Sequence, residues 1–64
     1  MKVTYDKETD VLYIRFSNNA VFDSDSEKPG IILDYDNTAN IVGIEVLNAS
    51  KKMEKPLQVD YEVV

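Results

Sequence analysis

The sequence predicts a mainly β protein, on the α+β borderline, with a single antiparallel sheet of two repeated β-hairpins and a C-terminal strand. Three observations lead to this class. Two similar stretches of twelve residues align without gaps, YDKETDVLYIRF at Tyr5–Phe16 and YDNTANIVGIEV at Tyr35–Val46. Apolar residues in both copies alternate with a period of two, as in half-buried strands. The tail LQVDYEVV, residues 57–64, alternates in the same way.

Each copy of the repeated phrase predicts a hairpin. A strand ends at Tyr-Asp, a short polar stretch follows, and a second strand of alternating apolar residues begins. Asp and Asn favour the turns because their side chains bond nearby backbone amides and tolerate left-handed conformations. The four predicted strands span residues 2–5, 11–17, 30–35 and 41–47.

The alternation also predicts two chemically different faces, as in an antiparallel sheet that is packed on one side and wet on the other. The apolar face would carry Val3, Tyr5, Leu12, Ile14, Phe16, Ile31, Leu33, Tyr35, Val42, Ile44 and Val46. The polar face would carry Thr4, Tyr13, Arg15, Asp34 and Glu45. Arg15 and Glu45 are equivalent in the two copies, so a cross-strand ion pair between them is one expectation.

Residues 18–30 are predicted to be a loop, because Asn, Ser, Asp, Pro and Gly dominate them. Val21 and Phe22 are the bulky apolar residues of this loop, and we expect them to fold back over one end of the sheet. After the second copy, residues 48–56 predict a short helical turn near 50–55. Its expected cap is Asn48 or Ser50, and its expected end is Pro56.

The tail predicts a further strand. Leu57, Val59, Tyr61 and Val63 would point to one side, with Gln58, Asp60 and Glu62 on the other. This strand would either join the sheet of its own chain or be offered to another chain. Tyr61 would then lie on the apolar face, as Tyr5 and Tyr35 do.

The predicted apolar face is larger than the side chains outside the sheet can cover. A sheet buries its apolar face against a second layer, and Val21, Phe22 and Met53 are the only candidates for that layer. Three arrangements would solve this problem: closure into a small half-barrel, face-to-face stacking of two copies, or a partner protein. We expect self-association as a homodimer, because two similar hairpins make a face that suits a twofold axis.

Length and composition narrow the class further. The 64 residues predict one domain, 1–64, without cysteine or histidine, so neither a disulfide nor a conventional zinc site is expected. Twelve acidic against seven basic residues give a net charge of -5, which disfavours direct binding of nucleic acid and favours a basic protein partner. No apolar run approaches a membrane span, and the N-terminus lacks a signal-peptide pattern, so we expect a cytoplasmic protein.

A metal site is the main chemical alternative. Asp23 and Asp25 alternate with serines in the predicted loop, and Asp34 falls where the twelfth residue of a calcium loop would stand. The comparison fails at the sixth position, where an EF-hand has glycine and this chain has Lys28. Paired carboxylates are a second source of chemistry, if Asp34, Asp36, Asp60 and Glu62 gather on the polar face. A solvent-facing sheet, however, predicts a charged solubilising surface.

The remaining polar residues predict no catalysis. The serines have no histidine to activate them, and Lys51, Lys52 and Lys55 form only a small basic cluster on the predicted helix. Tyr13 lies on the polar face, where it would either pack on the sheet or anchor a partner. The sequence therefore assigns no catalytic, cofactor-binding or metal-ligating residue, and no cofactor.

The repeated phrase resembles a known family, the domain-of-unknown-function family 2283 of small bacterial and archaeal proteins. The matching segments are Tyr5-Asp6, Asp10–Ile14, Leu33–Asp36, Ile41–Glu45 and Asn48-Ala49-Ser50. The chain departs from the pattern at Thr38-Ala39-Asn40, where such proteins usually place a glycine in the second turn. The resemblance implies no reaction and no catalytic residue, but it implies a role beside a small toxin-like protein, as an antitoxin-like neutraliser.

These observations lead to one functional expectation and one alternative. We expect a non-enzymatic protein-protein interaction module that self-associates and neutralises a basic, toxin-like partner. The alternative is a small metal-dependent hydrolase or metal-binding protein that uses Asp23, Asp25 and Asp34.

Overall fold

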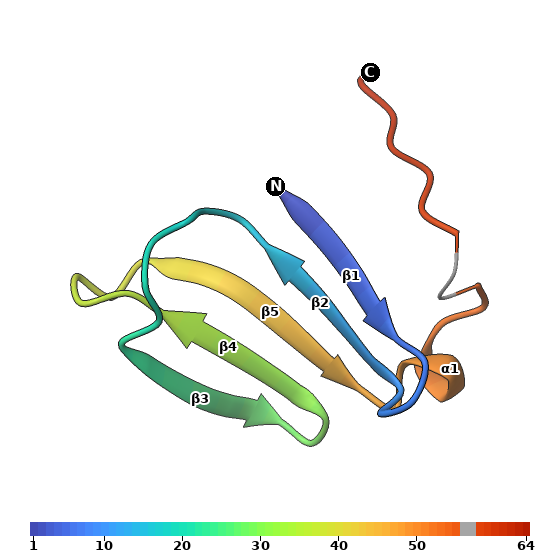
Figure 1. Ribbon diagram of the computed structural model, residues 1–64, viewed down its shortest axis with the longest axis horizontal. Helices are drawn as coiled ribbons and strands as arrows, with labels where there is room; N and C mark the ends of the chain where they lie inside the picture. Colours follow the sequence, from blue (N-terminus) through green and yellow to red (C-terminus); the bar gives the residue numbers. More distant parts are fainter. Residues whose placement is uncertain (56–57) are drawn as a thin grey trace.

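The computed structural model describes residues 1–55 and 58–64. Over these residues the chain forms one open antiparallel sheet of five strands and a short helix (Figure 1). The order across the sheet is β1-β2-β5-β4-β3. The elements are β1 Lys2–Asp6, β2 Val11–Arg15, β3 Asp23–Lys28, β4 Ile31–Tyr35, β5 Ile41–Leu47 and α1 Ala49–Lys52. The prediction of a mainly β protein with a single antiparallel sheet is confirmed.

Both copies of the repeated phrase form the predicted hairpins, β1–β2 and β4–β5 (Figure 1). Away from the turns their registers are the same, since Val3 lies opposite Ile14 and its counterpart Leu33 lies opposite Ile44. The second strands of the two hairpins, β2 and β5, pair with each other in the centre of the sheet. The two similar hairpins therefore make four of the five strands in the described part of the chain.

The two hairpin turns differ by one residue. In the first hairpin Asp6 pairs with Val11, whereas in the second the N–H of Asp36 donates to the carbonyl of Asn40 at 2.9 Å. A β-bulge beside Tyr35 accompanies the tighter turn. The left-handed residue is Asp10 in the first turn, with φ of 58°, and Ala39 in the second, with φ of 64°. Asp tolerates this conformation better than Ala does.

The loop prediction for residues 18–30 is wrong over Asp23–Lys28, which form the edge strand β3. The ladder begins where the N–H of Phe22 donates to the carbonyl of Tyr35 at 2.7 Å. Gly30, with φ of 83°, reverses the chain into β4. All six residues of β3 are exposed and polar, so they lack the apolar alternation from which a strand is predicted. Such a polar strand suits the edge of a sheet.

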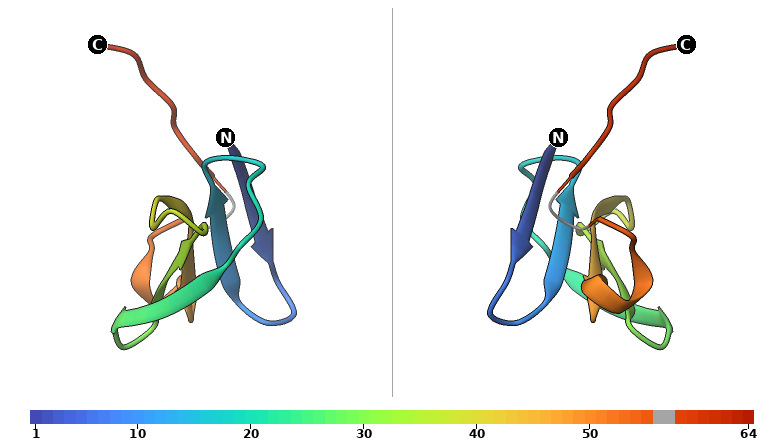
Figure 2. Two further views of the ribbon diagram at one scale, coloured as in Figure 1. Left: turned by 90° about the vertical axis from the view of Figure 1, so that its left-hand side faces the viewer. Right: turned by 90° about the vertical axis from the view of Figure 1, so that its right-hand side faces the viewer.

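The predicted C-terminal strand is wrong for residues 58–64, which form no strand and leave the sheet (Figures 1 and 2). Tyr61 consequently does not join the apolar face, and its side chain is 78% exposed. Leu57, the first residue of that prediction, lies outside the described residues, and so does Pro56. The alternation of the tail is real, but no strand of this chain pairs with it over the described residues.

The predicted helix near 50–55 begins earlier and is shorter, as α1 Ala49–Lys52. Neither predicted cap accepts a hydrogen bond in the expected way. Asn48 precedes the helix in a left-handed conformation and makes no side-chain cap bond. The carboxylate of Asp10, from the β1–β2 turn, instead accepts the N–H of Ser50 at 2.9 Å and its hydroxyl at 2.7 Å. The helix is therefore fastened by a residue forty positions earlier in the chain.

Helix α1 packs on the apolar face at one end of the twisted sheet (Figure 2). Ala49 is fully buried against Leu12 and Val46. Around this core lie the partly buried residues Tyr5, Ile14, Ile31, Ile44 and Met53. Of the residues expected to form the second layer, Met53 therefore contributes, while Ala49 was not foreseen. Among the described residues, no helix has the length and apolar character needed to cross a bilayer.

Candidate functional site

The apolar face is only partly covered in the described part of the chain. The sheet stays open, because β1 and β3 lie at opposite edges and do not pair, so closure into a half-barrel does not occur. Away from α1, side chains remain in contact with solvent: Val3 is 36% and Phe16 43% exposed, and Ile41, which the β-bulge sets opposite Tyr35 of the apolar face, is 44% exposed. The expected cover from the loop is incomplete, since Phe22 is 75% and Val21 44% exposed, although Val42 is buried. We call this surface the open apolar end.

Acidic side chains border the apolar face on its β3 side. Asp25 lies opposite Leu33, and Asp23 lies opposite Tyr35. Because cross-strand partners share a face of the sheet, these two carboxylates stand beside the apolar residues. Burial raises the pKa of the Tyr35 hydroxyl, and the charges of Glu27, Asp25 and Asp23 raise it further. The exposed acidic residues of β3, Asp23, Asp25 and Glu27, therefore form a negatively charged border of the apolar face, which we call the acidic border.

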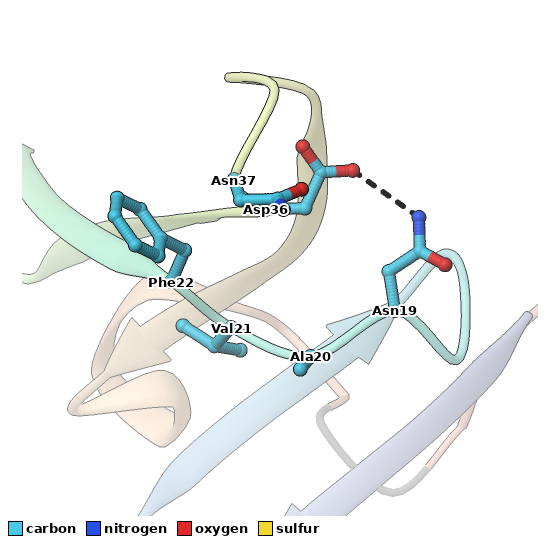
Figure 3. A pocket seen from close by; sticks show the side chains of 6 residues that line it. All are labelled: Asn19, Ala20, Val21, Phe22, Asp36 and Asn37. Atoms are coloured by element: carbon cyan, nitrogen blue, oxygen red, sulfur yellow. Dashed lines mark hydrogen bonds between the residues drawn. The ribbon is translucent and has the colours of Figure 1, made fainter.

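A hollow of about 350 Å³ lies at the end of the sheet far from α1 (Figure 3). It is lined by Asn19, Ala20, Val21, Phe22, Asp36 and Asn37. The amide of Asn19 donates to the Asp36 carboxylate at 3.1 Å, which ties the β2–β3 connection to the β4–β5 turn. Figure 3 shows the ring of Phe22 on one side of the hollow and this polar pair on the other.

Asp36 is a structural carboxylate and not a free acid. Its exposure is only 6%, and its Oδ1 accepts the N–H of Thr38 at 2.9 Å, the hydroxyl of Thr38 at 2.9 Å and the N–H of Asn40 at 3.0 Å. These hydrogen bonds, led by the N–H of Asn40, lower the pKa of Asp36 to about 2. Because these hydrogen bonds occupy the Asp36 carboxylate, it is not available to bind a ligand in the hollow.

Asp10 has the corresponding structural role at the other end of the sheet. Its Oδ1 accepts the hydroxyl of Tyr5 at 2.6 Å, and both carboxylate oxygens accept from Ser50. The hydrogen bonds from Tyr5 and Ser50 lower the pKa of Asp10, and the bond to Asp10 raises that of the Tyr5 hydroxyl. Asp10 thus joins β1, the first turn and α1. Its equivalent in the second copy is Asn40, which has no helix to hold.

The polar face carries a packed group around Gly43. Gly43 lies between Arg15 on β2 and Asp34 on β4. A Cβ atom at Gly43 would stand 2.6 Å from Tyr13 Oη and 2.8 Å from a carbon of its ring, so Tyr13 lies directly over the glycine. Arg15 donates to Tyr13 Oη at 3.3 Å and to the carbonyl of Asn19 at 2.7 Å. Of the two alternatives for Tyr13, the structure favours packing on the sheet.

Two carboxyl groups meet beside this group. Asp34 is 3% exposed and accepts the hydroxyl of Ser24 at 2.6 Å. Glu45 lies diagonally across the β4–β5 pair, because Asp34 is opposite Gly43 and Glu45 is opposite Ile32. Burial raises the pKa of Glu45, and the hydrogen bond with Asp34 and its charge raise it further. The expectation that the polar face offers no burial is therefore wrong at Asp34.

The other sequence candidates do not converge. By the alternation of β3, Asp23 and Asp25 lie on the apolar side, whereas Ser24 reaches Asp34 on the polar side. The calcium-like set is therefore split between two faces. Over residues 1–55 and 58–64, no group of three or more potential metal ligands is found. Asp60 and Glu62 are exposed in the tail, so the expected group with Asp34 and Asp36 does not form.

The remaining pairings also differ from expectation. The expected cross-strand partner of Arg15 was Glu45, but the register sets Arg15 opposite Gly43 and Glu45 opposite Tyr13. The partnership of Glu45 with Asp34 was missed. The signal for it exists in the sequence, because a hairpin of the second copy with the register of the first places these two residues diagonally. Lys51 and Lys52 are exposed at the end of α1, and Lys55 is exposed beyond it.

Comparison with known protein families gives one match. The model of the family described as "Protein of unknown function (DUF2283)" matches residues 2–50. The chain belongs to this family. Neither a curated protein nor a solved structure matches the chain significantly.

In this DUF2283 protein the family match spans all five described strands and ends inside α1. Asp10 and Ser50, which fasten the helix, therefore both fall within the matched region, as does the acidic border on β3. The tail, residues 58–64, lies beyond it. The family carries no assigned reaction, so the match establishes membership and leaves the activity to be argued from the surface.

Proposed function

We propose that the protein is a non-enzymatic protein-protein interaction module of the cytoplasm that self-associates and binds a basic protein. The observation that carries this proposal is the open apolar end, where Val3, Phe16 and Ile41 remain exposed. A sheet requires a second layer on its apolar face. Helix α1 supplies that layer over only one end, so an additional chain is the natural source of the rest.

The charge distribution supports a basic partner. Asp23 and Asp25 border the apolar face, and the whole chain has a net charge of -5. Complementary charge accelerates the encounter of two proteins and selects the partner, while burial of apolar surface holds the complex. Neutralisation of a basic, toxin-like protein, the role implied by the family resemblance, is compatible with this arrangement and is the form of binding that we propose.

Purification of the tagged protein from its native host tests the basic partner. We expect a basic protein to co-purify in stoichiometric amount, and to dissociate more readily as salt is raised. The variant Asp25→Asn/Glu27→Gln, which neutralises part of the border, should weaken binding. The matched control Glu8→Gln/Glu54→Gln removes the same charge from exposed positions elsewhere. Equal weakening by both variants would mean that net charge and not the border is recognised.

Self-association is tested separately by sedimentation velocity at micromolar concentration. We expect a dimer. A chain that stays monomeric over the accessible concentration range would refute this half of the proposal and leave the basic partner as the only cover for the open apolar end.

A further inference from the structure

The tail has the features of a strand that lacks a partner. Residues 58–64 alternate between apolar and polar side chains, yet they form no strand. The apolar side chains are left in water: Val59 is 61%, Tyr61 78% and Val63 83% exposed. Alternation of this kind is typical of a strand that buries one side. The tail therefore has the sequence pattern of a strand but pairs with no strand of the described sheet.

The sheet offers two free edges, and their charges differ. The edge strand β3 carries Asp23, Asp25 and Glu27, with Lys28 as its one base. The tail contributes Asp60 and Glu62, so pairing with β3 would bring acids together. The other edge strand, β1, has one base and one acid, Lys2 and Asp6. Because like charges across a strand pair are destabilising, β1 is the better edge for this tail.

We propose that the tail of one copy adds to β1 of a second copy as an antiparallel strand, and that the second copy reciprocates. This inference deepens the self-association proposed above and rests on it. In the register that we assign, Tyr61 lies opposite Val3, Val59 opposite Tyr5 and Glu62 opposite Lys2. The apolar side of the tail then packs beside Val3, one of the exposed residues of the open apolar end.

The register is selected by charge and by the pleat. A slip of one residue turns Tyr61 and its apolar neighbours to the polar face. A slip of two in one direction sets Asp60 opposite Asp6. A slip of two in the other direction sets Asp60 opposite Lys2 but moves Tyr61 beyond the end of β1, away from Val3. The assigned register avoids all three defects, and it opposes the remaining residues as Asp60 with Thr4 and Gln58 with Asp6, without like charges.

Two observations favour a second copy over the chain's own β1. Helix α1 packs on the apolar face, with Ala49 buried against Leu12 and Val46, so the chain passes over that face before the tail begins. Figure 1 draws the tail beyond the free edge of β1, and Figure 2 shows that it is displaced from β1 toward the side that carries α1 and does not join the strand. Reciprocal exchange also closes a twofold dimer in which both free β1 edges become paired.

Cysteine crosslinking tests the contact, because the natural chain has no cysteine. The single variants Thr4→Cys and Asp60→Cys are mixed in equal amounts, equilibrated and oxidised. We expect a disulfide-linked heterodimer as the main product, since opposed residues in a strand pair lie within disulfide reach. Two matched controls should crosslink weakly: Lys28→Cys mixed with Asp60→Cys, which samples the β3 edge, and Thr4→Cys mixed with Glu62→Cys, which samples the slipped register.

The double variant Thr4→Cys/Asp60→Cys distinguishes the two sources of the strand. A disulfide within one chain, with none between chains in the mixture of single variants, would overturn the proposal in favour of the chain's own tail. Equal crosslinking of Asp60→Cys with Thr4→Cys and with Lys28→Cys would overturn the choice of edge.

Sedimentation of Tyr61→Pro separates this inference from the proposed function. Proline removes a backbone donor from the middle of the tail. We expect the dimer dissociation constant to rise about tenfold or more, which corresponds to the loss of one or two hydrogen bonds and the packing around them. A wild-type dimer that Tyr61→Pro leaves unchanged would refute the tail contact while self-association stands. A wild-type monomer would refute both.

Discussion

Ile14 of β2 lies directly opposite Ile44 of β5, and these two residues hold the same position in the two copies of the repeated sequence. The neighbouring contacts exchange in the same manner: Leu12 lies opposite Val46, and the N–H of Phe16 donates to the carbonyl of Val42 at 2.8 Å. A local twofold axis therefore passes through the isoleucine pair. It explains how a duplicated hairpin yields a continuous four-stranded region.

Substitution of either isoleucine by alanine should destabilise the protein by almost the same amount. Ile14 and Ile44 are both partly buried beside the same core, so Ile14→Ala and Ile44→Ala should each lower the free energy of unfolding by about 2 kcal/mol. Urea denaturation monitored by circular dichroism measures the loss. Val21→Ala, at an exposed position outside the open apolar end, is the control and should cost much less. A large difference between Ile14→Ala and Ile44→Ala would contradict the twofold relationship.

The repeat is also why much of the sheet is predictable from the sequence. In β1, β2, β4 and β5 the apolar residues alternate, and the gapless alignment of the two copies carries the register of one hairpin to the other. The strand β3 is different. All its residues are polar, so no periodicity marks it, and it forms because the edge of β4 lies within reach of a chain that must return to Ile31.

The sequence does not predict the position of the tail or the contact between Asp34 and Glu45, for two other reasons. The tail, residues 58–64, has the alternation of a strand, but alternation specifies a side and not a partner. For Asp34 and Glu45 the sequence supplies the alternation, whereas their contact depends on the diagonal between two paired strands, which becomes visible only when the β4–β5 register is fixed. Asp34 also accepts a hydrogen bond from Ser24, a residue of the strand that the sequence does not predict.

The second turn contains a removable strain. Ala39 has φ of 64°, a left-handed conformation that disfavours residues with a Cβ atom and suits glycine. We expect Ala39→Gly to raise the free energy of unfolding by about 0.5 to 1 kcal/mol, because relief of the strain exceeds the extra entropy of glycine in the unfolded chain. Thermal unfolding should then shift upward by several degrees, on the order of 4 °C.

Asn37→Gly provides the matched control in the same turn. Asn37 does not have a positive φ, so glycine there adds entropy to the unfolded state and relieves no strain. It should lower the melting temperature. If both glycine variants changed stability in the same direction, the left-handed conformation at Ala39 would not be the cause.

Gly43 is required by the ring above it. Its added Cβ would lie 2.6 Å from Tyr13 Oη and 2.8 to 2.9 Å from ring carbons. Gly43→Ala must displace Tyr13 and should cost about 1 to 3 kcal/mol, the usual range for overpacking. The decisive measurement is a double-mutant cycle by denaturant unfolding. In a Tyr13→Ala background the same Gly43→Ala change should be neutral or slightly stabilising, because alanine suits a strand interior better than glycine.

A cost of Gly43→Ala that persists without the Tyr13 ring would place the conflict in the backbone and not in this contact. The cycle also reports on the polar face as a whole, since Tyr13 Oη accepts from Arg15. Displacement of the ring should therefore free the Arg15 guanidinium, which would be visible as a change in its side-chain NMR signals.

Asp36 should make the stability of the protein depend on pH in the acid range. Its folded pKa is about 2 against an ordinary value of 3.8. A carboxyl with a lowered folded pKa contributes stability that is fully present above its ordinary pKa and is lost as pH falls toward the folded value. The contribution of Asp36 should thus disappear between about pH 4 and pH 2, which denaturant unfolding over this range will measure.

Asp36→Asn isolates this contribution, because the pKa of Asp10 is lowered too and the wild-type curve contains both. The variant should be less stable than wild type at neutral pH, and the difference should shrink as pH falls through this range. Asp6→Asn is the matched control, since Asp6 is the equivalent residue of the first turn, is exposed, and accepts only the N–H groups of Glu8 and Thr9. It should cost less at neutral pH. A stability difference for Asp36→Asn that stays constant from neutral pH to pH 2 would show that the residue acts through shape and not through its charge.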